Sequence, residues 1–95
     1  MLEPKHVEGI HNEHKVFLYA LSTCGWCRKT KALLQELGIA YDYIDVDEQQ
    51  GPDRELAKQE VLKWNPSLSF PTMVLDDKES VIGFSEARIR RIVSE

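Results

Sequence analysis

Two cysteines, Cys24 and Cys27, stand two residues apart between an apolar run and a segment of helical periodicity. The run, Val16 to Leu21, reads VFLYAL and is rich in strand formers, which predicts a strand buried on both faces. After the cysteines, side chains suited to a core recur at helical spacing: Thr30, Leu33, Leu34 and Leu37. Gly38 is well placed to end this helix. The pattern therefore predicts a strand, a loop that carries Cys24, and a helix with Cys27 in its first turn.

The rest of the chain predicts two helices and three more strands. Residues 39–47 predict a strand, and residues 52–64 predict a helix that begins at Pro52 and ends before Asn65-Pro66. Residues 72–75 and 80–83 predict a β-hairpin around the turn DDKE. Ser85 is the predicted N-cap of a last helix. The order β-α-β-α-β-β-α predicts an α/β fold, a four-stranded mixed sheet flanked by helices. The alternation slips between Tyr43 and Ile44, which indicates either a strand covered on both faces or a bulge.

Residues 1–14 are polar and lack periodicity, so we expect a loose N-terminal arm before a domain of residues 15–95. A chain of 95 residues makes one domain, and we expect it to be a monomer. The net charge of −4 gives no reason to expect nucleic acid or an anionic membrane as a partner. No apolar run is long enough to span a bilayer, and the first residues lack a secretory h-region. We therefore expect a cytoplasmic protein, in which a cysteine pair is more often catalytic or metal-binding than structural.

The position of the two cysteines predicts different roles for them. Cys24 lies at a helix N-terminus, where unpaired N–H groups, the helix dipole and the nearby charges of Arg28 and Lys29 favour a negative sulfur. Cys27 lies one turn inside, on the face towards the core, and should hold its proton more firmly. Residues three apart on a helix are also close enough for a disulfide. We expect Cys24 to attack a disulfide and Cys27 to resolve the intermediate.

A cysteine pair at this spacing has two other common uses, a structural disulfide and a metal site. A structural disulfide would close a ring of only four residues, which stabilises a fold by about 2 kcal/mol in the loop-entropy model. A zinc site would need two more ligands, and only histidines of the arm, such as His11 and His14, are available at a spacing that fits no common zinc finger. The sequence thus favours redox chemistry and predicts no metal.

Several segments together resemble the glutaredoxin family of the thioredoxin superfamily. They are FLYALSTCGWCRKTKALLQELGIAYDYIDVD and SFPTMVLDDKESVIGFSE, within a match that covers about residues 15–95. The resemblance implies a dithiol-disulfide oxidoreductase that acts on disulfide-containing proteins through Cys24. It also implies that Pro71 is a cis-proline beside Cys24, and that the Phe70 backbone pairs with an extended substrate segment. The residues expected to contact substrate are Gly25, Trp26, Phe70, Pro71, Gly83, Phe84 and Ser85.

The sequence departs from the common glutaredoxin pattern where that pattern holds glutathione. Gly25 and Trp26 replace the proline and tyrosine of Cys-Pro-Tyr-Cys, and the family's two glutathione-clamping positions read Leu21 and Leu68. Charge-assisted hydrogen bonds are the strong ones, so we expect glutathione to be disfavoured and no cofactor to be tightly bound.

The GFSE turn, residues 83–86, resembles redoxins that take electrons from thioredoxin reductase. The resemblance therefore implies recycling by a thioredoxin-reductase-type flavoenzyme. Two alternatives stay open. One is a glutathione-dependent glutaredoxin, and the other is an iron–sulfur cluster carrier, for which Gly25 meets the condition of a non-proline residue after the first cysteine.

Overall fold

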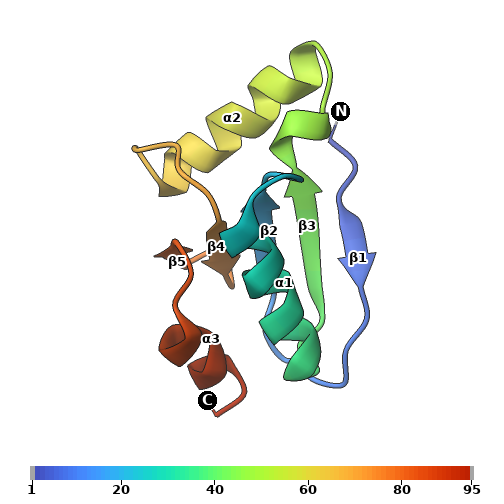
Figure 1. Cartoon of the computed structure of the whole chain (residues 1–95), viewed down its shortest axis with the longest axis vertical. Helices are drawn as coiled ribbons and strands as arrows, with labels where there is room; N and C mark the ends of the chain where they lie inside the picture. The colour runs from blue at the N-terminus through green and yellow to red at the C-terminus, as the bar shows by residue number, and fades with distance from the viewer. Residues whose placement is uncertain (1, 95) are drawn as a thin grey trace.

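The computed structural model describes residues 2–94, which form one mixed sheet with helices on both faces (Figure 1). The elements are β1 (Lys5–Val7), β2 (Val16–Ala20), α1 (Gly25–Glu36), β3 (Tyr41–Asp45), the 3-10 helix η1 (Val46–Glu48), α2 (Pro52–Trp64), β4 (Thr72–Leu75), β5 (Glu79–Ile82) and α3 (Glu86–Ile92). The sheet order is β1-β3-β2-β4-β5. β2 runs parallel to β3, as a strand-helix-strand unit requires, and antiparallel to β4. The predicted order of strands and α-helices is confirmed from β2 to α3, but the expected strand of residues 39–47 is shorter, because β3 ends at Asp45 and the chain then turns into η1.

The prediction of four strands is wrong, because the N-terminal segment adds a fifth. β1 pairs antiparallel with β3, and the imidazole of His6 lies 2.7 Å from the Asp42 carboxylate on that neighbouring strand. Gly9 then passes so close to β3's preceding turn that an added Cβ would lie 2.5 Å from the amide nitrogen of Ala40. His11 continues the contact through a hydrogen bond from its N–H to the Gly38 carbonyl, 2.8 Å long. Residues 5–11 are therefore part of the sheet edge and not a loose arm.

The central strands are covered on both faces, which resolves the slip in the pattern of β3. Leu18 and Tyr43 face the cluster built with α1 and α3, whereas Tyr19 and Ile44 face the cluster built with α2. The pairing of β2 with β3 advances one residue at a time from Phe17 opposite Asp42, so β3 contains no bulge. The burial of neighbouring residues on opposite faces explains why β3 does not alternate between polar and apolar side chains.

Local hydrogen bonds fix the C-terminal end of α1 and the loop that leads into β4. At the C-terminus of α1, Gly38 has φ +70°, and the N–H groups of Gly38 and Ile39 bond back to the carbonyls of Gln35 and Leu34. This is the Schellman arrangement that the glycine predicts. At the far side of the sheet, the buried Asn65 donates to the Ser69 carbonyl and to the Thr72 hydroxyl, each at 3.0 Å. Those bonds hold the loop that leads from α2 into β4.

None of the helices among residues 2–94 has the length and apolar character needed to cross a membrane.

Candidate active site

Cys24 and Cys27 meet at the N-terminus of α1 with unequal access to solvent. Cys24 is the N-cap residue, with extended backbone angles, and its sulfur accepts a hydrogen bond from the Cys27 N–H at 3.2 Å. Cys24 is partly exposed, whereas Cys27 has 0% of its surface exposed and belongs to the core. Both are free thiols in this structure. The structure thus places one sulfur at the surface and the other directly behind it.

The environment of Cys27 favours its neutral form. Burial raises the pKa of the Cys27 thiol, and the hydrogen bond with Cys24 raises it further. A thiol that keeps its proton is a poor nucleophile. The Cys24 sulfur, in contrast, accepts a hydrogen bond from the Cys27 N–H at a helix N-terminus, where negative charge is stabilised. The geometry therefore supports the predicted division between an attacking Cys24 and a resolving Cys27.

Lys31 is a contributor to this site that the sequence pattern did not reveal. Lys31 lies outside the helical pattern of core residues Thr30, Leu33, Leu34 and Leu37, but its ammonium group lies 3.0 Å from the Asp45 carboxylate and 4.1 Å from the centroid of the Tyr43 ring. Its positive charge lowers the pKa of Cys27, against the larger effect of burial. Nothing in the sequence distinguishes Lys31 from Lys29, the other lysine of α1, because the partners of Lys31 come from β3.

The loop before Cys24 is held by the acidic residue that follows β3. Asp47 accepts a hydrogen bond from the Ser22 N–H at 2.8 Å and another from the Ser22 hydroxyl. These two bonds hold the pKa of Asp47 below its usual value of 3.8. Two acidic residues of the DVD segment, residues 45–47, therefore contact the site: Asp45 forms an ion pair with Lys31, and Asp47 accepts hydrogen bonds from Ser22 in the cysteine loop.

An aromatic groove lies on the α3 side of the cysteines. It is lined by Trp26, Phe70, Pro71, Gly83 and Phe84, five of the seven residues expected to contact substrate. Trp26 is 57% exposed and stacks on Phe84 with 5.8 Å between ring centroids. The Phe70–Pro71 peptide bond is cis, and the Pro71 carbonyl accepts the Gly83 N–H at 2.8 Å. The groove is therefore an apolar surface fixed by backbone contacts.

The other two expected residues lie outside this groove. Gly25 is the exposed first residue of α1, with no atom within 4 Å of the place where a Cβ would stand. Ser85 is the N-cap of α3, and its hydroxyl accepts a hydrogen bond from the Arg88 N–H at 3.4 Å. Ser85 has a clear structural role there, because an N-cap side chain satisfies a helix N–H group that would otherwise lack a partner.

A second groove, which we name the leucine groove, lies on the α2 side of the cysteines. Its lining residues are Leu21, Val46, Asp47, Arg54, Lys58, Leu68 and Phe70. It brings together the two leucines that stand at the expected glutathione clamps, and it adds two cations, Arg54 and Lys58, that the sequence reading missed. In the sequence, their spacing of four residues predicts that both lie on one face of α2. The spacing does not show which face of the helix turns towards the cysteine loop.

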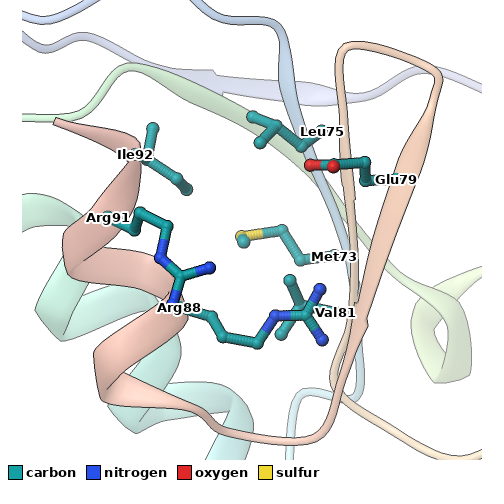
Figure 2. A pocket seen from close by; sticks show the side chains of 7 residues that line it. All are labelled: Met73, Leu75, Glu79, Val81, Arg88, Arg91 and Ile92. Carbon is teal, nitrogen blue, oxygen red and sulfur yellow. The ribbon is translucent and has the colours of Figure 1, made fainter. Parts of the chain in front are cut away.

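A third hollow lies between the β4–β5 hairpin and α3, and Figure 2 shows Arg88 and Arg91 reaching from the helix across it. Its floor is formed by core side chains such as Met73 and Val81. Neither cysteine lines it, and no residue of the loop before Cys24 takes part. The candidate active site is therefore the region between the aromatic and leucine grooves.

Comparisons with known proteins agree with this geometry. The family model described as glutaredoxin matches residues 16–80. Glutaredoxin 1 of Rickettsia bellii is 34% identical over 65 residues, which are 67% of this chain and 64% of that protein. This chain thus matches slightly less than two thirds of the length of that relative.

Two solved structures cover most of the chain. Methanoredoxin from Methanosarcina acetivorans has a TM-score of 0.85 and 41% identity, with 92% of this chain and 90% of that chain covered. A glutaredoxin from Methanosarcina mazei Go1 has a TM-score of 0.86 and 44% identity, with 97% and 88% covered. These likenesses establish a thioredoxin-like α/β fold. Together with the family match over most of its length, they show that this chain belongs to the glutaredoxin family.

Proposed function

We propose that the protein is a dithiol-disulfide oxidoreductase that reduces disulfides in other proteins. The observation that carries this proposal is the pair of free thiols at the start of α1, one partly exposed and one fully buried behind it. Membership of the glutaredoxin family supports the same activity. The aromatic groove beside the exposed sulfur offers an apolar surface to a protein partner.

The reaction proceeds in two exchanges. The Cys24 thiolate attacks one sulfur of the substrate disulfide, which forms a mixed disulfide and releases the other substrate sulfur as a thiolate that takes up a proton. Cys27 then loses its proton and attacks the Cys24 sulfur, which releases the second substrate thiol. The substrate gains two electrons and two protons, and the protein ends with a Cys24–Cys27 disulfide. The Cys27 N–H, at the start of α1, stabilises the negative charge that the Cys24 sulfur carries before the first exchange.

Variants of the two cysteines test this mechanism. Cys24→Ser is expected to abolish reduction of a protein disulfide, since the remaining thiol is buried. Cys27→Ser is expected to accumulate the mixed disulfide, detected by mass spectrometry as protein plus substrate. If Cys24→Ser still reduced disulfides, or if Cys27→Ser turned over normally, the proposed roles would be wrong.

For the return of electrons, we favour a thioredoxin-reductase-type flavoenzyme. The stacked Trp26 and Phe84 provide exposed aromatic surface of the kind that anchors protein partners. Leu21 and Leu68 offer no charge or hydrogen bond to the carboxylates of glutathione. Reduction by NADPH and such a flavoenzyme is therefore expected to be efficient, and reduction by glutathione slow.

Glutathione remains a second candidate because the leucine groove contains Arg54 and Lys58. Both cations can attract a carboxylate that the leucines cannot bind. The measurement that separates the two reductants is the rate at which each restores the dithiol from the oxidised protein. A glutathione rate equal to that of a typical glutaredoxin would reverse our preference.

A further inference from the structure

The hollow between the β4–β5 hairpin and α3, which we name the arginine hollow, contains two arginines that lack an ionic partner. It has a volume of about 80 Å³, and Figure 2 shows the side chains of Arg88 and Arg91 reaching into it from α3. The ion pairs formed within residues 2–94 include neither guanidinium, whereas Arg90 of the same helix binds two glutamates. Arg88 and Arg91 are therefore both able to donate hydrogen bonds to a ligand.

The charge of the arginine hollow suits one carboxylate. Arg88 and Arg91 stand three residues apart on α3, where like charges repel each other, so a bound anion would stabilise the pair. The third charged lining residue is Glu79, at the start of β5, which forms no ion pair with either arginine in the described chain. Two guanidinium groups and one carboxylate leave a single positive charge. A planar carboxylate also matches the fork of N–H donors that a guanidinium presents.

The floor of the hollow is apolar. It is formed by four nearly buried side chains: Met73, Leu75, Val81 and Ile92. The volume equals that of about three water molecules in the liquid, at roughly 30 Å³ each, which is enough for a small branched alkyl group. Water has few polar partners on such a floor, so an alkyl group is the better occupant. The hollow therefore fits an aliphatic group that carries one carboxylate.

The position of the hollow favours a polypeptide as the source of that carboxylate. β5 forms one wall of the hollow through Glu79 and Val81, and it is the last strand of the described sheet, paired with β4 on one side. An extended segment that adds to the free edge of β5 would lie directly beside the hollow. The last residue of such a segment carries both groups that the hollow fits, an aliphatic side chain and an α-carboxylate.

We propose that the arginine hollow binds the C-terminal residue of a partner protein. Its α-carboxylate pairs with Arg88 and Arg91, and an aliphatic side chain, such as that of leucine, contacts the apolar floor. Neither cysteine lines the hollow, so this binding site is separate from the disulfide chemistry and does not depend on it.

The experiment titrates three N-acetylated peptides into the reduced, isotope-labelled protein and follows its amide signals by NMR. The peptides are Ser-Gly-Ser-Gly-Leu with a free carboxylate, the same peptide with a C-terminal amide, and the free acid with glycine in place of leucine. We expect the leucine acid to shift the amide signals of Val81, Arg88 and Arg91. It should bind about tenfold more tightly than either other peptide, since one lacks the charge-assisted hydrogen bonds and the other lacks the apolar group. The double change Arg88→Gln with Arg91→Gln should lower the affinity for the leucine acid to that of the amide.

Arg90→Gln is the matched control, because it makes the same charge change on α3 at a guanidinium that Glu86 and Glu36 already bind. It should keep the affinity for the leucine acid, and melting temperatures should show that all variants are folded. The proposal would be overturned by the absence of shifts at these amides, by equal affinities for the leucine acid and its amide, or by an affinity that survives the double change of Arg88 and Arg91. Isovalerate is the last probe. If it binds as tightly as the leucine acid, the hollow serves small acids and a protein C-terminus is not its ligand.

Discussion

The two cysteines acquire different chemistry from a difference of one helical turn. Cys24 sits at the N-cap with its sulfur partly exposed, and Cys27 sits inside with none of its surface exposed. Their positions and unequal exposure could be predicted from the sequence, since a helix N-terminus and a core-facing position both follow from local periodicity. The contacts of Lys31 could not be predicted in this way, because its partners Asp45 and Tyr43 come from β3 and only the tertiary fold brings them close.

At the residue scale, Lys31 is expected to support the second thiol exchange. In Lys31→Met, Cys27 loses a cation that lowers its pKa, so release of the mixed disulfide should slow by a few-fold at neutral pH. Asp45, nearly buried, also loses its ionic partner, which should reduce the free energy of unfolding by about 1–3 kcal/mol. Stopped-flow fluorescence and denaturant unfolding measure the two effects. Lys31→Arg keeps the charge and serves as the control, and an unchanged rate of release in Lys31→Met would contradict the role of Lys31.

At the scale of elements, the loop before α1 is held by hydrogen bonds from Ser22 to Asp47, which lies in η1 just after β3. In Ser22→Ala the hydroxyl bond that contributes most to the lowered pKa of Asp47 is lost. A lowered carboxylate pKa gives stability that is present above 3.8 and lost as the pH falls through the folded-state value. We therefore expect Ser22→Ala to bring the pKa of Asp47 back towards 3.8 and to move acid unfolding to higher pH. NMR titration of the carboxylate measures the shift.

Ser67→Ala, at an exposed position in the loop after α2, is the matched control for this prediction. It should leave the titration of Asp47 unchanged. The same titration in Ser22→Ala and in the original protein would show that the hydroxyl does not hold the carboxylate.

The N-terminal strand β1 is an element that the sequence patterns did not predict. β1 has three residues and two of them are exposed, so neither hydrophobic alternation nor length distinguishes it from a loop. Its attachment depends on Gly9, whose missing side chain allows close approach to the backbone of residues 38–40. A glycine in a polar segment does not show from sequence alone which backbone it approaches.

Gly9→Ala is expected to detach this segment. The added Cβ would lie 2.5–2.6 Å from backbone atoms, which cannot yield as a flexible side chain can. We expect a loss of about 1–3 kcal/mol in the free energy of unfolding, typical of overpacking. The His11 and Ala40 amides, which bond across this junction, should exchange faster with deuterium. Glu8→Ala, at an exposed neighbouring position, is the control, and normal protection of both amides in Gly9→Ala would refute the prediction.

For the whole molecule, the fold was more predictable than the surface around the cysteines. A buried strand, a helix and a parallel strand leave few topologies, and the hairpin with its following helix completes the sheet. The fifth strand adds only an edge. The grooves beside Cys24 instead combine residues from the cysteine loop, α2, and the loops before β4 and α3. Their composition depends on how distant elements pack together, and the sequence of any one element does not show it.

The buried thiol also links the stability of the whole protein to pH and to oxidation state. In the reduced protein the pKa of Cys27 is raised, so the folded state keeps a proton that the unfolded chain loses near pH 9.0. Stability should therefore fall as the pH rises above that value, by about 1.4 kcal/mol at pH 10. The disulfide form has no such thiol, so the difference in melting temperature between the oxidised and reduced proteins should widen from pH 7 to pH 10. At this chain length, each kcal/mol corresponds to roughly 4–8 °C.

A control variant separates the contribution of Cys27 from that of the other buried groups that titrate at high pH. Tyr19 and Tyr41, whose pKa values burial also raises, are present in every form, so their contribution to the alkaline loss of stability is shared. Reduced Cys27→Ser keeps Cys24 and both tyrosines but lacks the buried thiol. Calorimetry at pH 7 and pH 10 should therefore show a larger loss in the reduced original protein than in reduced Cys27→Ser. Equal losses in the two proteins would mean that the Cys27 proton does not stabilise the reduced fold.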